Sequence, residues 1–195
     1  LNPQSLYAQT KIAVEQYVLE RASELPSAAT VLRIATAYGL SPRMRFDLTV
    51  SQFAWELASG RPLEVYDADT WRPYCHIRDI SKAVMTVLTA PECAVRGEVF
   101  NVGDTAQQFT KRMIVDEVAR HVGETSVLYG DKGSDPRNYR VSFAKIAENL
   151  AFRCDYTVQD YIPRLAAAVQ AGVFPDVSAD PRFGNYKVMH VEPTH

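Results

Sequence analysis

The sequence has few cysteines and no long hydrophobic run, and each shortage excludes a class of protein. Its three cysteines, Cys75, Cys93 and Cys154, are odd in number and lie far apart. This pattern argues against a disulfide framework and against a Cys-x-x-Cys metal site, so we expect a reducing, cytoplasmic location. No apolar stretch approaches the ~18 residues needed to cross a bilayer, so we expect no membrane partner.

An excess of charge of one sign is also missing. The chain has 21 basic and 23 acidic residues, which give a net charge of −2. No basic run or stripe marks a surface for nucleic acid, so no nucleic-acid partner is predicted. His121, His190 and His195 do not share ligand spacing with cysteines or carboxylates, and no metal site is predicted. The apolar content of 47% is typical of a globular protein with a sizeable core.

Helical and strand patterns alternate along the chain, which predicts an α/β fold. The β-branched run at 30–34 is of the kind that a parallel sheet buries on both faces, and it is expected to end at the turn of Tyr38 and Gly39. Little periodicity follows residue 174, so 175–195 are expected to form an extended or mobile tail. Helices are predicted at 5–25, 47–58, 79–88, 110–121, 143–150 and 158–171, and strands at 30–34, 63–66, 74–77, 99–103 and near 127.

Tyr7 and Lys11 are the first residues whose spacing indicates chemistry. Side chains four residues apart lie on one face of a helix, and a nearby cation favours the phenolate form of a tyrosine. A phenol beside an ammonium therefore suits proton transfer at an alcohol or ketone. The alternative is an exposed surface pair, because so short a motif also occurs by chance.

Five segments in a fixed order give this pair a context. Together they resemble the C-terminal portion of the extended short-chain dehydrogenase/reductase family, specifically its NAD-dependent nucleotide-sugar epimerases and dehydratases. The resemblance runs from about residue 5 to about residue 171. Its motifs are YAQTK (7–11), LRIATAYG (32–39), WRPYCHIRD (71–79), FNVG (100–103) and DPRNY (135–139).

The resemblance implies a fold, a division of the chain and a cofactor. It implies the C-terminal part of a Rossmann-like parallel-sheet domain plus a small α/β substrate-binding lobe. Residues 1–39 would end the dinucleotide-binding domain and carry the Tyr/Lys helix. Residues 40–174 would form mainly the sugar-nucleotide-binding lobe, with segments that return to the Rossmann-like sheet. The implied cofactor is NAD or NADP.

The resemblance also implies roles for the residues near the cofactor. Tyr7 would be the general acid/base at the sugar hydroxyl that undergoes hydride transfer. Lys11 would bind the nicotinamide ribose and favour the phenolate of Tyr7. Ile34 and Thr36 would lie beside the nicotinamide, and Thr36 also beside the sugar, although many relatives carry Asn at the position of Thr36.

Arginines are the expected ligands of a nucleoside diphosphate sugar, because a guanidinium meets paired phosphate oxygens bidentately. By resemblance, Arg72 and Arg137 would hold the diphosphate, and Asn101 would bind on the nucleotide side. The alternatives are an exposed strand-edge charge for Arg72 and a salt bridge with Asp135 for Arg137. Cys75 and His76 are interpreted as structural, and Asp79 as a carboxylate that interacts with a helix N-terminus.

One expected element of the family is missing from the sequence. No Gly-x-x-Gly-x-x-Gly follows a predicted strand, so this chain alone should bind NAD poorly. The first residue is Leu, and we expect a processed or truncated chain that is the C-terminal part of a larger enzyme.

Three functions are compatible with these motifs. The first is an epimerase or dehydratase that uses transient hydride transfer. The second is an NAD(P)H-dependent keto-sugar reductase of the same family, and the third is a noncatalytic nucleotide-sugar-binding module. Relatives are usually dimers, so a homodimer is expected, with contacts from Leu6, Ile12, Gln16 and Leu19.

Overall fold

The computed structural model describes residues 3, 5–130, 138–174, 177–178 and 180–185 of the 195-residue chain. Among these residues, no helix combines the length and the apolar character needed to span a membrane. The helices are α1 (Leu6–Glu20), α2 (Thr49–Ala58), α3 (Ile77–Thr89), α4 (Glu92–Val95), α5 (Lys111–Val122), α6 (Ala144–Leu150), α7 (Val158–Gln170) and the 3-10 helix η1 (Pro181–Phe183). The strands are β1 (Val31–Ile34), β2 (Thr36–Tyr38), β3 (Leu63–Tyr66), β4 (Trp71–His76), β5 (Val99–Val102), β6 (Gln108–Thr110) and β7 (Val127–Gly130).

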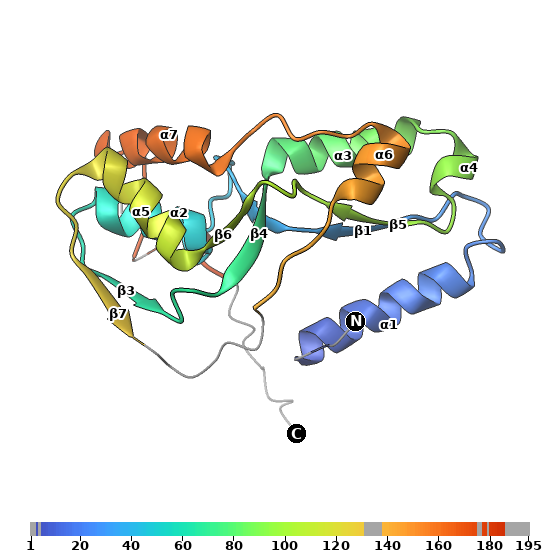
Figure 1. Cartoon of the computed structure of the whole chain (residues 1–195), viewed down its shortest axis with the longest axis horizontal. Coiled ribbons are helices and arrows are strands. Elements are labelled where there is room, and N and C mark those ends of the chain that lie inside the picture. The colour runs from blue at the N-terminus through green and yellow to red at the C-terminus, as the bar shows by residue number, and fades with distance from the viewer. Residues whose placement is uncertain (1–2, 4, 131–137, 175–176, 179, 186–195) are drawn as a thin grey trace, which may run out of the picture.

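Parallel strands β1 and β5 form the centre of one layered unit. They pair from Val31 opposite Val99 to Ile34 opposite Val102. Helices α3 and α6 lie on one side of this pair, and α1 lies on the other (Figure 1). Helices on both faces of parallel strands are the arrangement of a Rossmann-like α/β unit, so the predicted fold class is confirmed.

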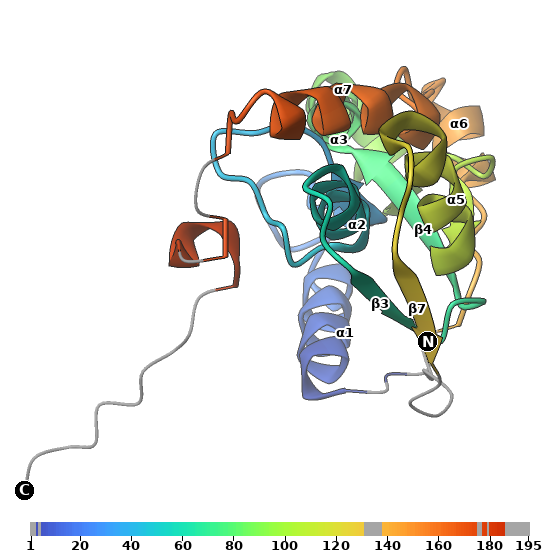
Figure 2. The same cartoon turned by 90° about the vertical axis from the view of Figure 1, so that its left-hand side faces the viewer.

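A second unit lies at the other end of the molecule. Strands β3 and β7 pair in parallel, and helices α2, α5 and α7 pack together beside them (Figures 1 and 2). Between the two units, β2 and β4 pair in parallel and β4 pairs with β6 in the antiparallel direction. The small sheet β2-β4-β6 therefore links the layered unit to the second unit.

Each unit has its own apolar cluster. The cluster of the second unit contains Val50, Ile114 and Ile162, which come from α2, α5 and α7. The cluster of the layered unit contains Phe100 from β5 and Ile146 from α6. Burying such side chains contributes about 1.5–3 kcal/mol each, so the two clusters hold most of the fold together.

Helix ends follow local signals in the sequence. The hydroxyl of Thr110 accepts a hydrogen bond from Met113 N at 3.2 Å, and Gly123 ends α5 with φ of +85°. Gly39, with φ of +137°, ends β2, and a Cβ there would lie 2.7 Å from Ile77 Cγ1. A residue with a side chain would therefore disturb the contact between this turn and α3.

The structure differs from the secondary structure predicted from the sequence at three places. Residues 31–38 contribute to two sheets, because β1 pairs with β5 and β2 pairs with β4. Strand β4 begins at Trp71, before the predicted start at 74, since Trp71 pairs with Thr110 of the short strand β6. Within the predicted tail, η1 packs on the molecule: Phe46 N donates to Phe183 O at 2.8 Å, and the two rings meet edge to face.

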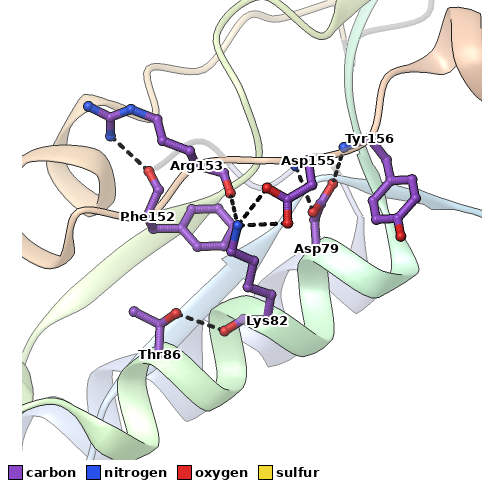
Figure 3. Close-up of polar contacts among 7 residues, drawn as sticks. All are labelled: Asp79, Lys82, Thr86, Phe152, Arg153, Asp155 and Tyr156. Atoms are coloured by element: carbon purple, nitrogen blue, oxygen red, sulfur yellow. Dashed lines mark hydrogen bonds and ion pairs between the residues drawn. The ribbon is translucent and has the colours of Figure 1, made fainter.

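The segment 151–157 connects α6 of the layered unit to α7 of the second unit, and the Asp79 carboxylate holds it (Figure 3). Asp79 is 1% exposed and accepts hydrogen bonds from Asp155 N at 2.9 Å and Tyr156 N at 3.2 Å. Lys82 adds contacts from the next turn of α3, to Arg153 O at 2.9 Å and to the Asp155 carboxylate at 2.7 Å. The start of α3 therefore anchors the connection between the two clusters.

We expect Asp79→Ala to lower the free energy of unfolding by about 3 kcal/mol, because two backbone N–H groups lose their buried acceptor. Urea denaturation at pH 7 measures this change. The control is Asp155→Ala, which removes only the half-exposed ion pair with Lys82 and should cost less than about 1 kcal/mol. Equal costs for the two variants would contradict the anchoring role of Asp79.

Candidate active site

A cleft of about 1030 Å³ opens between the layered unit and the second unit. Three predicted site residues from distant parts of the chain line it: Tyr7 of α1, Thr36 of β2 and Arg72 of β4. Its size is at the upper end of the range for small-molecule sites, about 300–1000 Å³. Its remaining walls come from α2, β3, α5 and β7, and include Thr49, Gln52, Phe53, Glu56, Leu63, Glu64, Val65, Tyr66, Lys111 and Leu128.

Helix α1 brings Tyr7 to the cleft and Lys11 close to Tyr7. The helix begins after Ser5, whose hydroxyl accepts a hydrogen bond from Ala8 N at 3.2 Å. Tyr7 is 71% exposed, and Lys11 Nζ lies 5.4 Å from the centre of its ring. Lys11 itself does not line the cleft. The pair thus lies on one helix face, as the spacing predicts, with both polar groups accessible.

One charged contact ties α1 to the sheet. The Arg33 guanidinium on β1 binds the Glu15 carboxylate with two hydrogen bonds, one of them from Nε at 2.8 Å. The hydrogen bond from Arg33 lowers the pKa of Glu15 below its ordinary value of 4.5. No residue of α1 is fully buried, and this pair is one contact that orients the helix that carries Tyr7.

The pairing of β2 with β4 brings the Thr36 and Arg72 segments together. Thr36 lies opposite Tyr74 in the parallel register, two residues beyond Arg72 on β4. The Arg72 guanidinium lies 5.3 Å from the centre of the Tyr139 ring, and one of its nitrogens donates to Trp71 O at 2.8 Å. The strand pairing therefore delivers a hydroxyl and a guanidinium to the same cleft.

Charged side chains that the sequence analysis missed line the second unit's wall of the cleft. Lys111 Nζ donates to Tyr66 O at 2.6 Å, and the Tyr66 hydroxyl donates to the Glu64 carboxylate at 2.8 Å. Burial raises the pKa of Glu56 above its ordinary value. No sequence motif marks these residues as part of a site. The one sequence signal is that Lys111 directly follows Thr110, the N-cap residue of α5, and so lies at the start of a helix.

The other predicted site residues lie outside this cleft. Ile34 and Asn101, from the adjacent strands β1 and β5, line a separate pocket of about 470 Å³. Asn101 Nδ2 donates to Ser142 O at 3.1 Å, and Ile34 is 49% exposed. Arg137 and its alternative partner Asp135 lie outside the described residues.

His76 and Asp79 have structural contacts, in line with their interpretation from the sequence. His76 is 6% exposed, its Nδ1 accepts from Arg78 N at 3.2 Å, and its ring stacks on Tyr156. Burial lowers the pKa of His76. Within the part of the chain that the structure describes, no three His, Cys, Asp or Glu side chains converge as metal ligands would.

Together, the fold and the cleft define a Rossmann-like α/β protein with an attached lobe. The model of the NAD dependent epimerase/dehydratase family matches residues 1–103, which is more than half of the chain. The chain therefore belongs to this family, and the resemblance predicted from the five motifs is confirmed.

Solved structures show the same fold. A dTDP-glucose 4,6-dehydratase from Bacillus anthracis, in complex with NAD, is 21% identical with a TM-score of 0.76, and the match covers 92% of this chain and 55% of that chain. A Thermus thermophilus UDP-glucose 4-epimerase in complex with NAD is 23% identical with a TM-score of 0.73, and the match covers 87% of this chain and 55% of that chain. RMD from Pseudomonas aeruginosa, in complex with NADPH, is 20% identical with a TM-score of 0.76, and the match covers 88% of this chain and 58% of that chain. The chain thus spans little more than half the length of these structures.

We expect Glu15→Gln to loosen α1 at neutral pH, by less than about 1 kcal/mol because the pair is partly exposed. The folded-state pKa of Glu15 is lowered, so its contribution is present above the unfolded pKa near 4.5 and is lost as the pH falls through the folded value. Hydrogen exchange of the α1 amides should be faster in the variant at pH 7 and equal to wild type at acidic pH. Exchange in the control Glu20→Gln, an exposed position on α1, should match wild type at both pH values.

Proposed function

We propose that this chain is the part of an NAD(P)-dependent nucleotide-sugar epimerase or dehydratase that supplies the acid/base tyrosine and the sugar-nucleotide lobe. The observation that carries this proposal is the cleft in which Tyr7, Thr36 and Arg72 meet. It joins a proton-transfer group to a phosphate-binding group in a space that suits a nucleoside diphosphate sugar. The family, and the dTDP-glucose dehydratase and UDP-glucose epimerase among the similar structures, support this reading.

The residues of this chain fit the nicotinamide end of the cofactor. Lys11 is exposed and its ammonium lies near the Tyr7 ring, where it can donate hydrogen bonds to ribose hydroxyls. Ile34 ends β1 half-exposed in the separate pocket, and we propose that its apolar side chain packs on the nicotinamide ring. Lys11 and Ile34 would hold the nicotinamide end, and the bound group would supply a reversible acceptor for the hydride of the sugar. The NAD and NADPH in the similar structures support this choice of cofactor.

Tyr7 is the group that moves the proton. Removing hydride from an alcohol carbon requires the hydroxyl proton to leave as well, and the Tyr7 oxygen accepts it. When hydride returns to the ketone, the same oxygen gives the proton back. The Lys11 ammonium, 5.4 Å from the centre of the Tyr7 ring, places a positive charge beside the ring. Thr36, which also lines the cleft, holds a sugar hydroxyl near Tyr7.

Arg72 holds the diphosphate, at a distance from the reacting carbon. Its guanidinium presents parallel N–H donors to paired phosphate oxygens, and this contact anchors the sugar in one orientation. We propose that Arg137 and Asn101 contribute to nucleotide binding in the complete site. Residues 40–174 then supply most of the sugar-nucleotide lobe, while residues 1–39 end the dinucleotide-binding domain.

The activity is tested on the whole protein with NAD or NADP and a panel of nucleoside diphosphate sugars. An epimerase or dehydratase converts the sugar without net change in the absorbance of reduced nicotinamide, because the hydride returns in each turnover. A steady loss of that absorbance with a keto sugar would instead identify a reductase. Failure to bind any nucleotide sugar would overturn the proposal.

Tyr7→Phe should lower kcat by about 100- to 10 000-fold, because the phenylalanine can neither accept nor give the proton. Binding of the nucleotide sugar, measured by calorimetry, should change little. Tyr17→Phe is a matched control, since Tyr17 lies on the same helix but does not line the cleft. If Tyr7→Phe retains full activity, Tyr7 is not the acid/base; if neither wild type nor variant turns over any substrate, the protein is a binding module.

Arg72→Ala should raise the Kd for a nucleoside diphosphate by about 10- to 100-fold, the cost of losing charged hydrogen bonds to the phosphates. Titration calorimetry with the diphosphate alone measures this effect without the chemical step. Arg120→Ala removes an exposed guanidinium that pairs with Glu117 on α5 and does not line the cleft. The control should bind as wild type does, and equal losses in both variants would point to a general effect of charge.

The homodimer stays a prediction. Leu6, Val14 and Tyr17 of α1 are each more than half exposed, which is compatible with a partner or a further domain lying on this helix.

A further inference from the structure

Part of the cleft wall is a loop rather than a helix or a strand. Residues 41–48 lead from β2 to α2, and the last two of them, Asp47 and Leu48, line the cleft together with Thr49, the first residue of α2. Leu48 is the N-cap residue of α2, but its side chain makes no capping hydrogen bond. Since no strand pairing and no side-chain cap fixes these residues, their position depends on contacts with other segments.

The loop turns some side chains into the core and others toward the cleft. Met44 and Phe46 are 2% and 6% exposed and belong to the apolar cluster of the second unit. Arg45 and Asp47, which alternate with them, form an ion pair with two hydrogen bonds of 2.6 Å. Phe46 therefore attaches the loop to the core, while its neighbour Asp47 faces the cleft.

η1 and the residue after it supply the contacts behind Phe46. Phe46 N donates to Phe183 O at 2.8 Å, and the two ring centres lie 5.6 Å apart in an edge-to-face arrangement. The Phe174 ring completes the group, 5.2 Å from the ring of Phe46 and 6.3 Å from that of Phe183. Arg43 adds a hydrogen bond of 3.3 Å from Nη2 to Gly184 O. Three aromatic rings and two hydrogen bonds thus join η1 to the loop.

η1 reaches the loop as a closed turn. The Asp180 carboxylate accepts a hydrogen bond from Arg182 N at 2.9 Å, and Gly184 N donates to Pro181 O at 3.3 Å. The proline ring also fixes the backbone at the first position of the turn. The turn is therefore held at both ends, and it presents the Phe183 ring to the loop.

We propose that Phe183 is a positioning residue for substrate binding, which acts through Phe46 to hold Asp47, Leu48 and Thr49 along the cleft. The inference rests on the proposed function, because it places these three residues in the wall that the nucleoside diphosphate sugar contacts. The family model matches residues 1–103, so η1 lies outside the part of the chain that it covers.

The effect falls on binding rather than on proton transfer. Phe183 packs on the cluster of the second unit, whereas Tyr7 is carried by α1 of the layered unit (Figure 1). Loss of the Phe183 ring lets the loop leave the position that suits the ligand, but it leaves the acid/base group where it is. A loss of this kind raises KM and leaves kcat nearly unchanged.

Phe183→Ala in the whole protein should raise the Kd and the KM for the nucleotide sugar by about 3- to 10-fold, the equivalent of one hydrogen bond to the ligand, and should change kcat by less than about twofold. The probes are UDP-glucose and dTDP-glucose, followed by other nucleoside diphosphate sugars. Titration calorimetry measures Kd, and turnover assays separate KM from kcat. Phe183→Tyr keeps the ring and should bind as wild type does.

Val177→Ala is the control for a general loss of stability. Val177 is 9% exposed and lies in the same apolar cluster, near η1 in the sequence. Its truncation should lower the free energy of unfolding in urea, as Phe183→Ala does, but should leave the Kd of the nucleotide sugar unchanged.

Coupling between the cleft and η1 must also act in the opposite direction. Saturating nucleotide sugar should slow hydrogen exchange of the η1 peptide in wild type, including the Gly184 N–H that donates to Pro181 O. The same ligand should not slow exchange of this peptide in Phe183→Ala, because the ring that connects it to the loop is gone.

The results separate this inference from the proposed function. If wild type binds none of the nucleotide sugars, the proposed function fails and this inference fails with it. If wild type binds and Phe183→Ala binds equally well, the positioning role is overturned while the proposed function stands. An equal loss of binding in Val177→Ala would also overturn the positioning role, since stability alone would then account for the effect.

Discussion

The buried carboxylate of Asp79 holds the connection on which both units of the described structure depend. The chain leaves the layered unit after α6 and enters the second unit at α7, and between them it has no helix or strand to satisfy its backbone. Asp79 accepts two of those N–H groups. It also lies in the first turn of α3, where a negative charge is favourable. One side chain thus interacts with the start of α3 and with the segment that connects the two units. These contacts explain why a carboxylate is tolerated in an almost fully buried position.

The cleft depends on this connection, because its walls belong to different units. Tyr7 comes from the helix that lies under β1, whereas Glu56, Glu64 and Lys111 come from the second unit. A change in the angle between the units would separate the proton-transfer group from the charged wall. The cleft would therefore respond to how firmly residues 151–157 are held.

The local structure could largely be predicted from the sequence. Thr110 and Gly123 marked the two ends of α5, since each satisfies or terminates the backbone by itself. The pairing of β2 with β4, and β6 itself, could not be predicted in this way. Strands of three residues contain too little alternation to be distinguished from a loop, and they exist only because a partner strand completes their hydrogen bonds.

The sequence by itself determined family membership, through motifs in a fixed order, and the placement of Tyr7 and Lys11 on one helix face, through their spacing. Only the tertiary structure decided that Tyr7, Thr36 and Arg72 share a cleft while Asn101 lies in another pocket. The physical reason is range: turns, caps and helix faces depend on neighbouring residues, whereas contacts between distant segments depend on which strands pair and how the clusters pack.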